Sequence, residues 1–154
     1  MSSEISKKLT LDWPPHISYD SSDERISENF SERTGFVAKR TSIFYKKRLL
    51  DVFLFALALG KRKGIRTPLK KKSQAMPTDA LTEEEIWLMT SVALSEPKSD
   101  LDILTKPAEI VKICEEYANT GINDLITRDY NSSLSDPLGP YEKLLEEGLK
   151  EQAK

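Results

Sequence analysis

Seven lysine and arginine side chains lie close together between residues 61 and 72, and the chemistry they offer is anion binding. We call residues 61–72 the basic segment; its cations are Lys61, Arg62, Lys63, Arg66, Lys70, Lys71 and Lys72. Cations at this density neutralise phosphates and release condensed counterions, which favours affinity without sequence readout. Aromatic residues do not alternate with these cations, so a platform for stacking single-stranded bases is not predicted. The segment therefore indicates contact with a duplex backbone, with an acidic protein, or with the chain's own acidic C-terminal half.

Charge is strongly polarised along the chain. Residues 39–72 hold twelve Lys or Arg against one acid, Asp51, whereas residues 1–35 hold four basic and seven acidic residues and residues 73–154 hold seven and seventeen. The formal net charge of −2 hides this distribution. Such a distribution is typical of proteins that bind a polyanion or an oppositely charged partner.

Residues that commonly perform catalysis are sparse, and their positions do not converge. The one histidine, His16, follows Pro15 and is predicted to lie at the surface. Cys114 has no neighbouring histidine and is predicted to be a small buried hydrophobe. Acidic pairs such as Glu115-Glu116 point about 100° apart on a helix, so we expect solvated faces rather than a metal site. We therefore predict no enzyme, no catalytic residue, no metal and no cofactor.

The basic segment is positioned by the helix that precedes it. A helix is expected from Thr41, where a hydroxyl can cap it, to Leu59, with Gly60 as its end. From Leu49 onward this helix is apolar nearly all round, which places it in the centre of a domain. Gly64 and Pro68 then interrupt the basic segment, so that we expect a loop there.

The remaining helices follow from their caps and apolar spacing. Thr82 and Glu85 form a capping box that opens a helix ended by Pro97. Pro107 opens another, with Gly121 predicted as its stop and one further turn over residues 122–126. A short terminal helix is expected over residues 141–149, and β-structure has only weak candidates at 36–37 and 65–69. The fold class is therefore mainly α: a single compact helical domain, residues 35–154, around a buried central helix.

Residues 1–34 are predicted to form a flexible N-terminal arm, because they are rich in Ser, Asp and Glu and show no regular apolar period. Trp13, Ile17 and Tyr19 within it are candidates for a partner-binding segment. The alternative is that these side chains pack on their own domain.

The composition favours a soluble cytoplasmic protein. Cys114 is the only cysteine, which excludes an intrachain disulfide and a zinc site of several thiolates. Residues 1–11 lack the apolar core of a signal peptide, and the apolar run from Leu49 to Leu59 is far shorter than the roughly 20 residues of a spanning helix.

The central helix and the turn after it resemble a known family. Residues 50–60, LDVFLFALALG, followed by residues 64–69, GIRTPL, are similar to small accessory proteins encoded beside DNA phosphorothioation (Dnd) systems. In that group a helix of the form D-x-x-x-F-A-A-x-x-G leads into a basic turn ending in R-x-P-L. The resemblance extends to Pro77 and to residues 117–121. It implies an accessory role in DNA sulphur modification, or in the linked restriction of unmodified DNA, and carries no catalytic residues with it.

Two functions therefore stand beside each other at the level of sequence. The first is a non-enzymatic accessory subunit of a prokaryotic DNA modification and defence system, which contacts the DNA backbone or another subunit through the basic segment. The second is a protein-protein adaptor without a DNA role, in which the N-terminal arm and the acidic C-terminal half recognise the partner.

Overall fold

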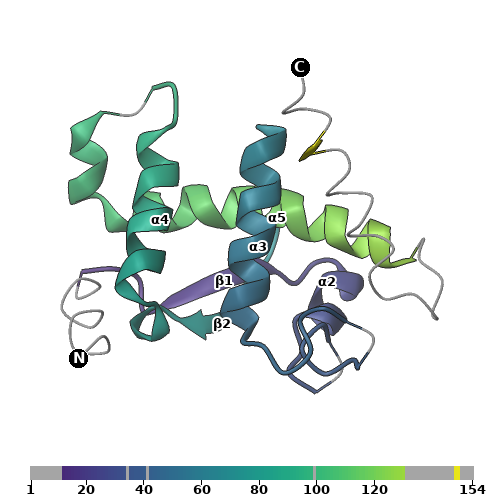
Figure 1. Cartoon of the computed structure of the whole chain (residues 1–154). Helices are drawn as coiled ribbons and strands as arrows, with labels where there is room; N and C mark the ends of the chain where they lie inside the picture. The colour runs from purple at the N-terminus through teal and green to yellow at the C-terminus, as the bar shows by residue number, and fades with distance from the viewer. Residues whose placement is uncertain (1–11, 34, 41, 99, 131–147, 150–154) are drawn as a thin grey trace.

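The computed structural model describes residues 12–33, 35–40, 42–98, 100–130 and 148–149 (Figure 1). It is mainly helical, as predicted, with one small antiparallel sheet. The elements are β1 (His16–Asp20), α2 (Glu24–Asn29), α3 (Leu49–Lys63), β2 (Lys72–Pro77), η1 (Thr78–Ala80), α4 (Glu83–Leu94), η2 (Leu101–Thr105) and α5 (Pro107–Tyr130). No helix among the described residues is long and apolar enough to cross a membrane.

Helices α3 and α5 cross at the centre of the molecule, with α4 and η2 to one side and α2 to the other (Figure 1). Two glycines make this crossing close. A Cβ atom on Gly60 would lie 1.8 Å from the carbonyl oxygen of Tyr117, and one on Gly121 would lie 1.8 Å from that of Ala56. Both glycines had been predicted as helix ends, and both predictions are wrong. Helix α3 ends instead at Gly64, whose φ of 71° is left-handed, and α5 continues to Tyr130.

The core around this crossing confirms that the central helix is buried. Val52, Phe53 and Leu57 are each at most 1% exposed. The helix nevertheless begins at Leu49 rather than at Thr41. Lys46 has a φ of 62°, a left-handed conformation that a helix does not continue through, and the Asp51 carboxylate accepts the Arg48 amide at 2.8 Å to cap the helix that follows.

Strand β1 pairs with β2, so the arm predicted for residues 1–34 is wrong over residues 12–33. Ile17 lies opposite Met76 in the sheet, and both side chains are buried. After the strand, Asp23 caps α2 by accepting the Arg25 amide at 2.9 Å, and Ile26 enters the core. Residues 1–11 lie outside the described part of the chain. The weak strand candidates at 36–37 and 65–69 are not strands.

The starts predicted for α4 and α5 are confirmed, in contrast to the start predicted at Thr41. The Thr82 amide donates to Glu85 Oε1 at 2.9 Å and the Glu85 amide donates to Thr82 Oγ1 at 3.2 Å, which is a complete capping box. Pro107 occupies the first position of α5. The terminal helix expected over residues 141–149 falls outside the described residues, apart from 148 and 149.

Candidate functional site

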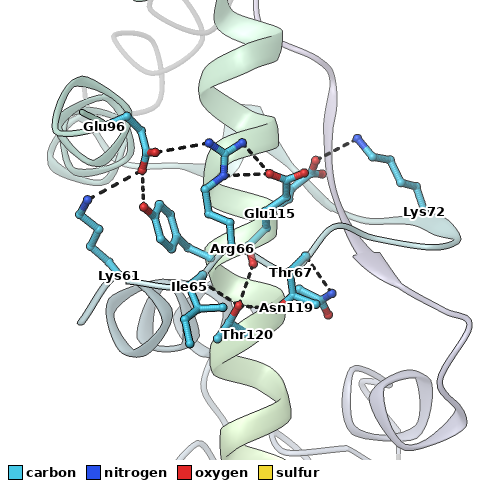
Figure 2. Close-up of polar contacts among 11 residues, drawn as sticks. Lys61, Ile65, Arg66, Thr67, Lys72, Glu96, Glu115, Asn119 and Thr120 are labelled. Carbon is cyan, nitrogen blue, oxygen red and sulfur yellow. Dashed lines mark hydrogen bonds and ion pairs between the residues drawn. The ribbon is translucent and has the colours of Figure 1, made fainter. Parts of the chain in front are cut away.

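The basic segment begins in the last turn of α3 and lies along α5, where Lys61, Lys63, Arg66 and Lys72 meet acidic side chains. Figure 2 shows these contacts for Lys61, Arg66 and Lys72. Arg66 Nη2 lies 2.6 Å from Glu116 Oε1, and its Nη1 lies 3.4 Å from Glu96 Oε2. The lysine pairs are Lys61 with Glu96 at 3.8 Å, Lys63 with Asp124 at 3.1 Å and Lys72 with Glu115 at 3.3 Å. The intramolecular alternative left open by the sequence therefore holds for these four side chains.

Glu115 and Glu116 are not the solvated face that the sequence suggested. Their residues are only 4% and 8% exposed. Because neighbouring helical residues point in different directions, Glu115 reaches the sheet, where it accepts the Ser18 amide at 2.6 Å, while Glu116 reaches Arg66. The two acids thus bind two different segments to α5.

We expect ionisation of Glu115 to lower the stability of the wild-type protein as pH rises, and we predict that Glu115→Gln abolishes this effect. Burial, the largest influence, raises the pKa of this carboxyl above its ordinary value, against the opposing hydrogen bond from Ser18 and the charge of Lys72. Between the ordinary and the raised pKa the folded state holds more protons than the unfolded state, so stability falls as pH rises through that window.

Urea denaturation of both proteins from about pH 4 to about pH 8 measures this effect. As pH rises, the unfolding free energy of the wild-type protein should fall relative to that of Glu115→Gln. A difference that is constant across the range would show that Glu115 ionises like an exposed carboxyl.

Hydrogen bonds from α5 also hold the backbone of the basic segment. The Thr67 amide donates to the Glu116 carbonyl at 3.1 Å, and Asn119 Nδ2 donates to the Thr67 carbonyl at 3.1 Å. Thr120 Oγ1 donates to the Ile65 carbonyl at 2.8 Å. Residues 65–67 therefore have a fixed path over α5 although they belong to no regular element (Figure 2).

Glu96, just beyond α4, joins this network to the end of α3. It accepts a hydrogen bond from the Tyr117 hydroxyl and pairs with Lys61, whose Nζ lies 5.1 Å from the centre of the Tyr117 ring. Burial, together with the bond to Glu96, raises the pKa of Tyr117 to about 12. The hydroxyl therefore stays protonated and acts as a hydrogen-bond donor.

Lys70 and Lys71 are placed differently from the four paired cations. The Asp20 carboxylate accepts their backbone amides at 3.1 and 3.2 Å, and the Ser21 amide donates to the Lys71 carbonyl at 2.8 Å. Burial opposes ionisation of Asp20, but hydrogen bonds from Ser22 and from these amides outweigh it and lower the pKa of the carboxyl. Both lysine side chains are exposed, and neither has an acidic partner within the described ranges. Arg62 is also exposed, on the last turn of α3.

The partner-binding residues proposed for the arm belong largely to the domain itself. Ile17 is fully buried, Tyr19 stacks on Phe30 with ring centres 5.4 Å apart, and Trp13 is half-buried against the core. These contacts favour the alternative in which the three side chains pack on their own domain.

The remaining candidate residues form no reactive site. Cys114 is buried as predicted, and burial raises the pKa of its thiol further above the ordinary range. His16 lies half-buried at the start of β1, not at the open surface that was predicted. In the parts of the chain that the structure describes, no group of three His, Cys, Asp or Glu side chains could hold a metal ion.

The acids on α5 are what sequence reasoning missed. The sequence held one signal of their burial. Glu115 and Glu116 have apolar neighbours on both sides, Ile113 and Cys114 before them and Tyr117 and Ala118 after them, and all six residues are buried. An acidic pair in such a position must have cationic or hydrogen-bonding partners.

The sequence was also compared with models of known protein families. A family model described as DNA sulphur modification system-associated protein 4 matches residues 34–135, well over half of the chain. The chain belongs to this family. The match covers α3, the basic segment, α4 and α5, and so includes the four acids that pair with Lys61, Lys63, Arg66 and Lys72, while β1 and α2 precede it. The resemblance seen in the sequence is confirmed. Comparisons with curated proteins and with solved structures found no match.

Proposed function

We propose that this protein is a non-enzymatic accessory subunit of a DNA sulphur modification system and that it contacts the DNA phosphate backbone through Lys70 and Lys71. Its membership of the family supports a place in modification, or in the linked restriction of unmodified DNA as an antiviral defence. The position of the two lysines supports the contact with DNA. Four other cations of the segment already have acidic partners, so they contribute less to an external anion.

The observation that carries this proposal is that the Asp20 carboxylate accepts hydrogen bonds from two consecutive backbone amides. That carboxylate fixes the backbone of Lys70 and Lys71, while the side chains project into solvent from the turn before β2. A fixed backbone lowers the entropy lost when a side chain meets a phosphate. Contacts of this kind position a protein on DNA without reading its bases.

The pairing of charged groups supports a non-enzymatic role. Glu96, Glu115 and Glu116 each bind a cation, and Glu96 also holds the Tyr117 hydroxyl. Side chains committed in this way hold the basic segment and the end of α4 to α5. The same residues explain why the basic segment keeps one path across α5.

Charge reversal at the exposed lysines tests the proposal. Lys70→Glu/Lys71→Glu should weaken binding to a short DNA duplex by about tenfold or more at low salt, since two phosphate contacts become repulsive. Fluorescence anisotropy of a labelled duplex measures the affinity. Lys98→Glu/Lys112→Glu, an equal charge change at two exposed lysines elsewhere, is the control and should have a much smaller effect. Equal losses in both variants would show that only net charge matters and would remove the assigned contact.

A further inference from the structure

Helix α4 and η2 carry large apolar side chains that the other described residues leave exposed. We call this the α4–η2 surface, formed by Trp87, Leu88, Leu94, Leu101 and Leu104, which are between 36% and 74% exposed. Trp87 and Leu94 are seven residues apart on α4 and therefore share one side of the helix, beside Leu88. Helix α4 and η2 are in contact, on the side of the molecule away from α2 (Figure 1).

A cavity adjoins this surface. It has a volume of about 410 Å³ and opens between the end of α4, η2 and α5, where Pro97, Ile103 and Ile113 contribute to its wall. Three charged residues also line it: Arg66 and Glu96, which are paired with each other, and Lys98. An apolar side chain from outside can therefore enter without separating the two charges. Grooves that receive a helix commonly offer such a recess to one anchoring residue.

Acidic side chains flank the apolar ones. Residues 79–104 contain seven acids and one base, Lys98. Two of these acids, Glu85 and Glu96, are already paired with cations of the protein. The other five have no cationic partner among the described residues, and all are exposed: Asp79, Glu83, Glu84, Asp100 and Asp102.

These observations together decide the kind of occupant. We propose that the α4–η2 surface docks a basic amphipathic helix of a partner protein, with the partner's apolar side chains on Trp87 and Leu88 and its lysines or arginines beside Glu83 and Glu84. Exposed tryptophan in an apolar patch is characteristic of sites that dominate binding energy. The acidic flank repels nucleic acid and attracts a basic protein segment, so DNA and the partner occupy different parts of the molecule.

A designed peptide tests this without knowledge of the natural partner. The probe is a fluorescently labelled amphipathic helix of about 18 residues, roughly five turns, with leucine on one side and lysine on the other. We expect it to bind the full-length protein at low salt, as measured by anisotropy. The same peptide with glutamate in place of lysine should not bind.

Two variants divide the surface into its apolar and acidic parts. Leu88→Ser/Leu94→Ser should weaken peptide binding by about tenfold, because exposed side chains can be changed with little effect on folding while the partner loses its apolar contact. Glu83→Gln/Glu84→Gln should weaken it by roughly threefold or more and flatten its salt dependence. Glu24→Gln/Glu32→Gln, an equal change at exposed acids that belong to neither α4 nor η2, should leave binding unchanged.

Several outcomes would overturn the proposal. Failure of the full-length protein to bind the lysine peptide would do so, as would equal losses in the α4 and control variants. A dimer in sedimentation that Leu88→Ser/Leu94→Ser dissociates would assign the surface to a second copy of this chain. A cross-link from a photoreactive residue at position 88 to the chain's own terminal residues would assign it to an intramolecular contact. None of these measurements involves DNA, so they stand apart from the test of Lys70 and Lys71.

Discussion

Replacing Gly121 with alanine should lower the free energy of unfolding by about 3 kcal/mol or more, even though alanine is the better helix former by about 1 kcal/mol. The added Cβ would lie 1.8 Å from the carbonyl oxygen of Ala56, and 2.6 and 2.8 Å from the carbonyl carbon and Cα of that residue. Backbone atoms cannot rotate away as a flexible side chain does. Helices α3 and α5 must therefore separate along their crossing, which loosens the centre of the core.

Urea denaturation measures this loss, and Gly148 provides the matched control. A Cβ atom at Gly148 meets nothing within 4 Å, so Gly148→Ala should change stability by no more than about 0.5 kcal/mol. If Gly121→Ala were as stable as the wild-type protein, the two helices would not approach as closely as the structure has them.

The second large effect is expected at Phe53. This side chain is 1% exposed, in the middle of α3. Phe53→Ala should lower the free energy of unfolding by about 3 to 5 kcal/mol, since it removes a large buried ring and leaves a cavity. Trp87→Ala, a truncation of similar size at a residue that is 52% exposed, is the control and should have far less effect on the same measurement. Equal losses at both positions would mean that α3 is not the core of the domain.

Local sequence signals predicted some helix boundaries correctly and misplaced others, and the two ends misplaced at glycines share one physical reason. The capping box of Thr82 and Glu85 and the first-turn Pro107 act within a few residues, so the sequence alone reveals them. Gly60 and Gly121 resemble helix stops locally. Their role is to let α3 and α5 touch, and that requires knowledge of which segments cross.

Strand β1 was missed because its stabilisation is non-local. Residues 16–20 follow two prolines in a polar region, and their partner β2 lies more than fifty residues later. The pairing buries Ile17 against the core, an outcome that no local period reveals.

The sequence predicted which cations form the candidate site but not which of them are paired with acids. The density of cations in the basic segment is a property of composition, and the sequence therefore identified all seven. Which of them are neutralised depends on Glu96, Glu115 and Glu116, which become neighbours only when α4 and α5 pack beside the segment. The distinction between Arg66, held by two acids, and Lys70, held through its backbone, is therefore a property of the fold.

The central claim is that the basic segment contains two sets of cations with different roles, and one paired measurement tests it most directly. Lys70→Gln/Lys71→Gln and Lys61→Gln/Arg66→Gln remove the same charge, and both DNA affinity against salt and urea denaturation can be measured on each. The first variant should lower the slope of log affinity against log salt by about 2 and leave stability unchanged. The second should lower stability by roughly 1 to 3 kcal/mol, less than for a fully buried pair because the Arg66 side chain is 33% exposed, and should change the slope less. The reverse pattern, with the DNA slope unchanged in the first variant and lost in the second, would contradict the account.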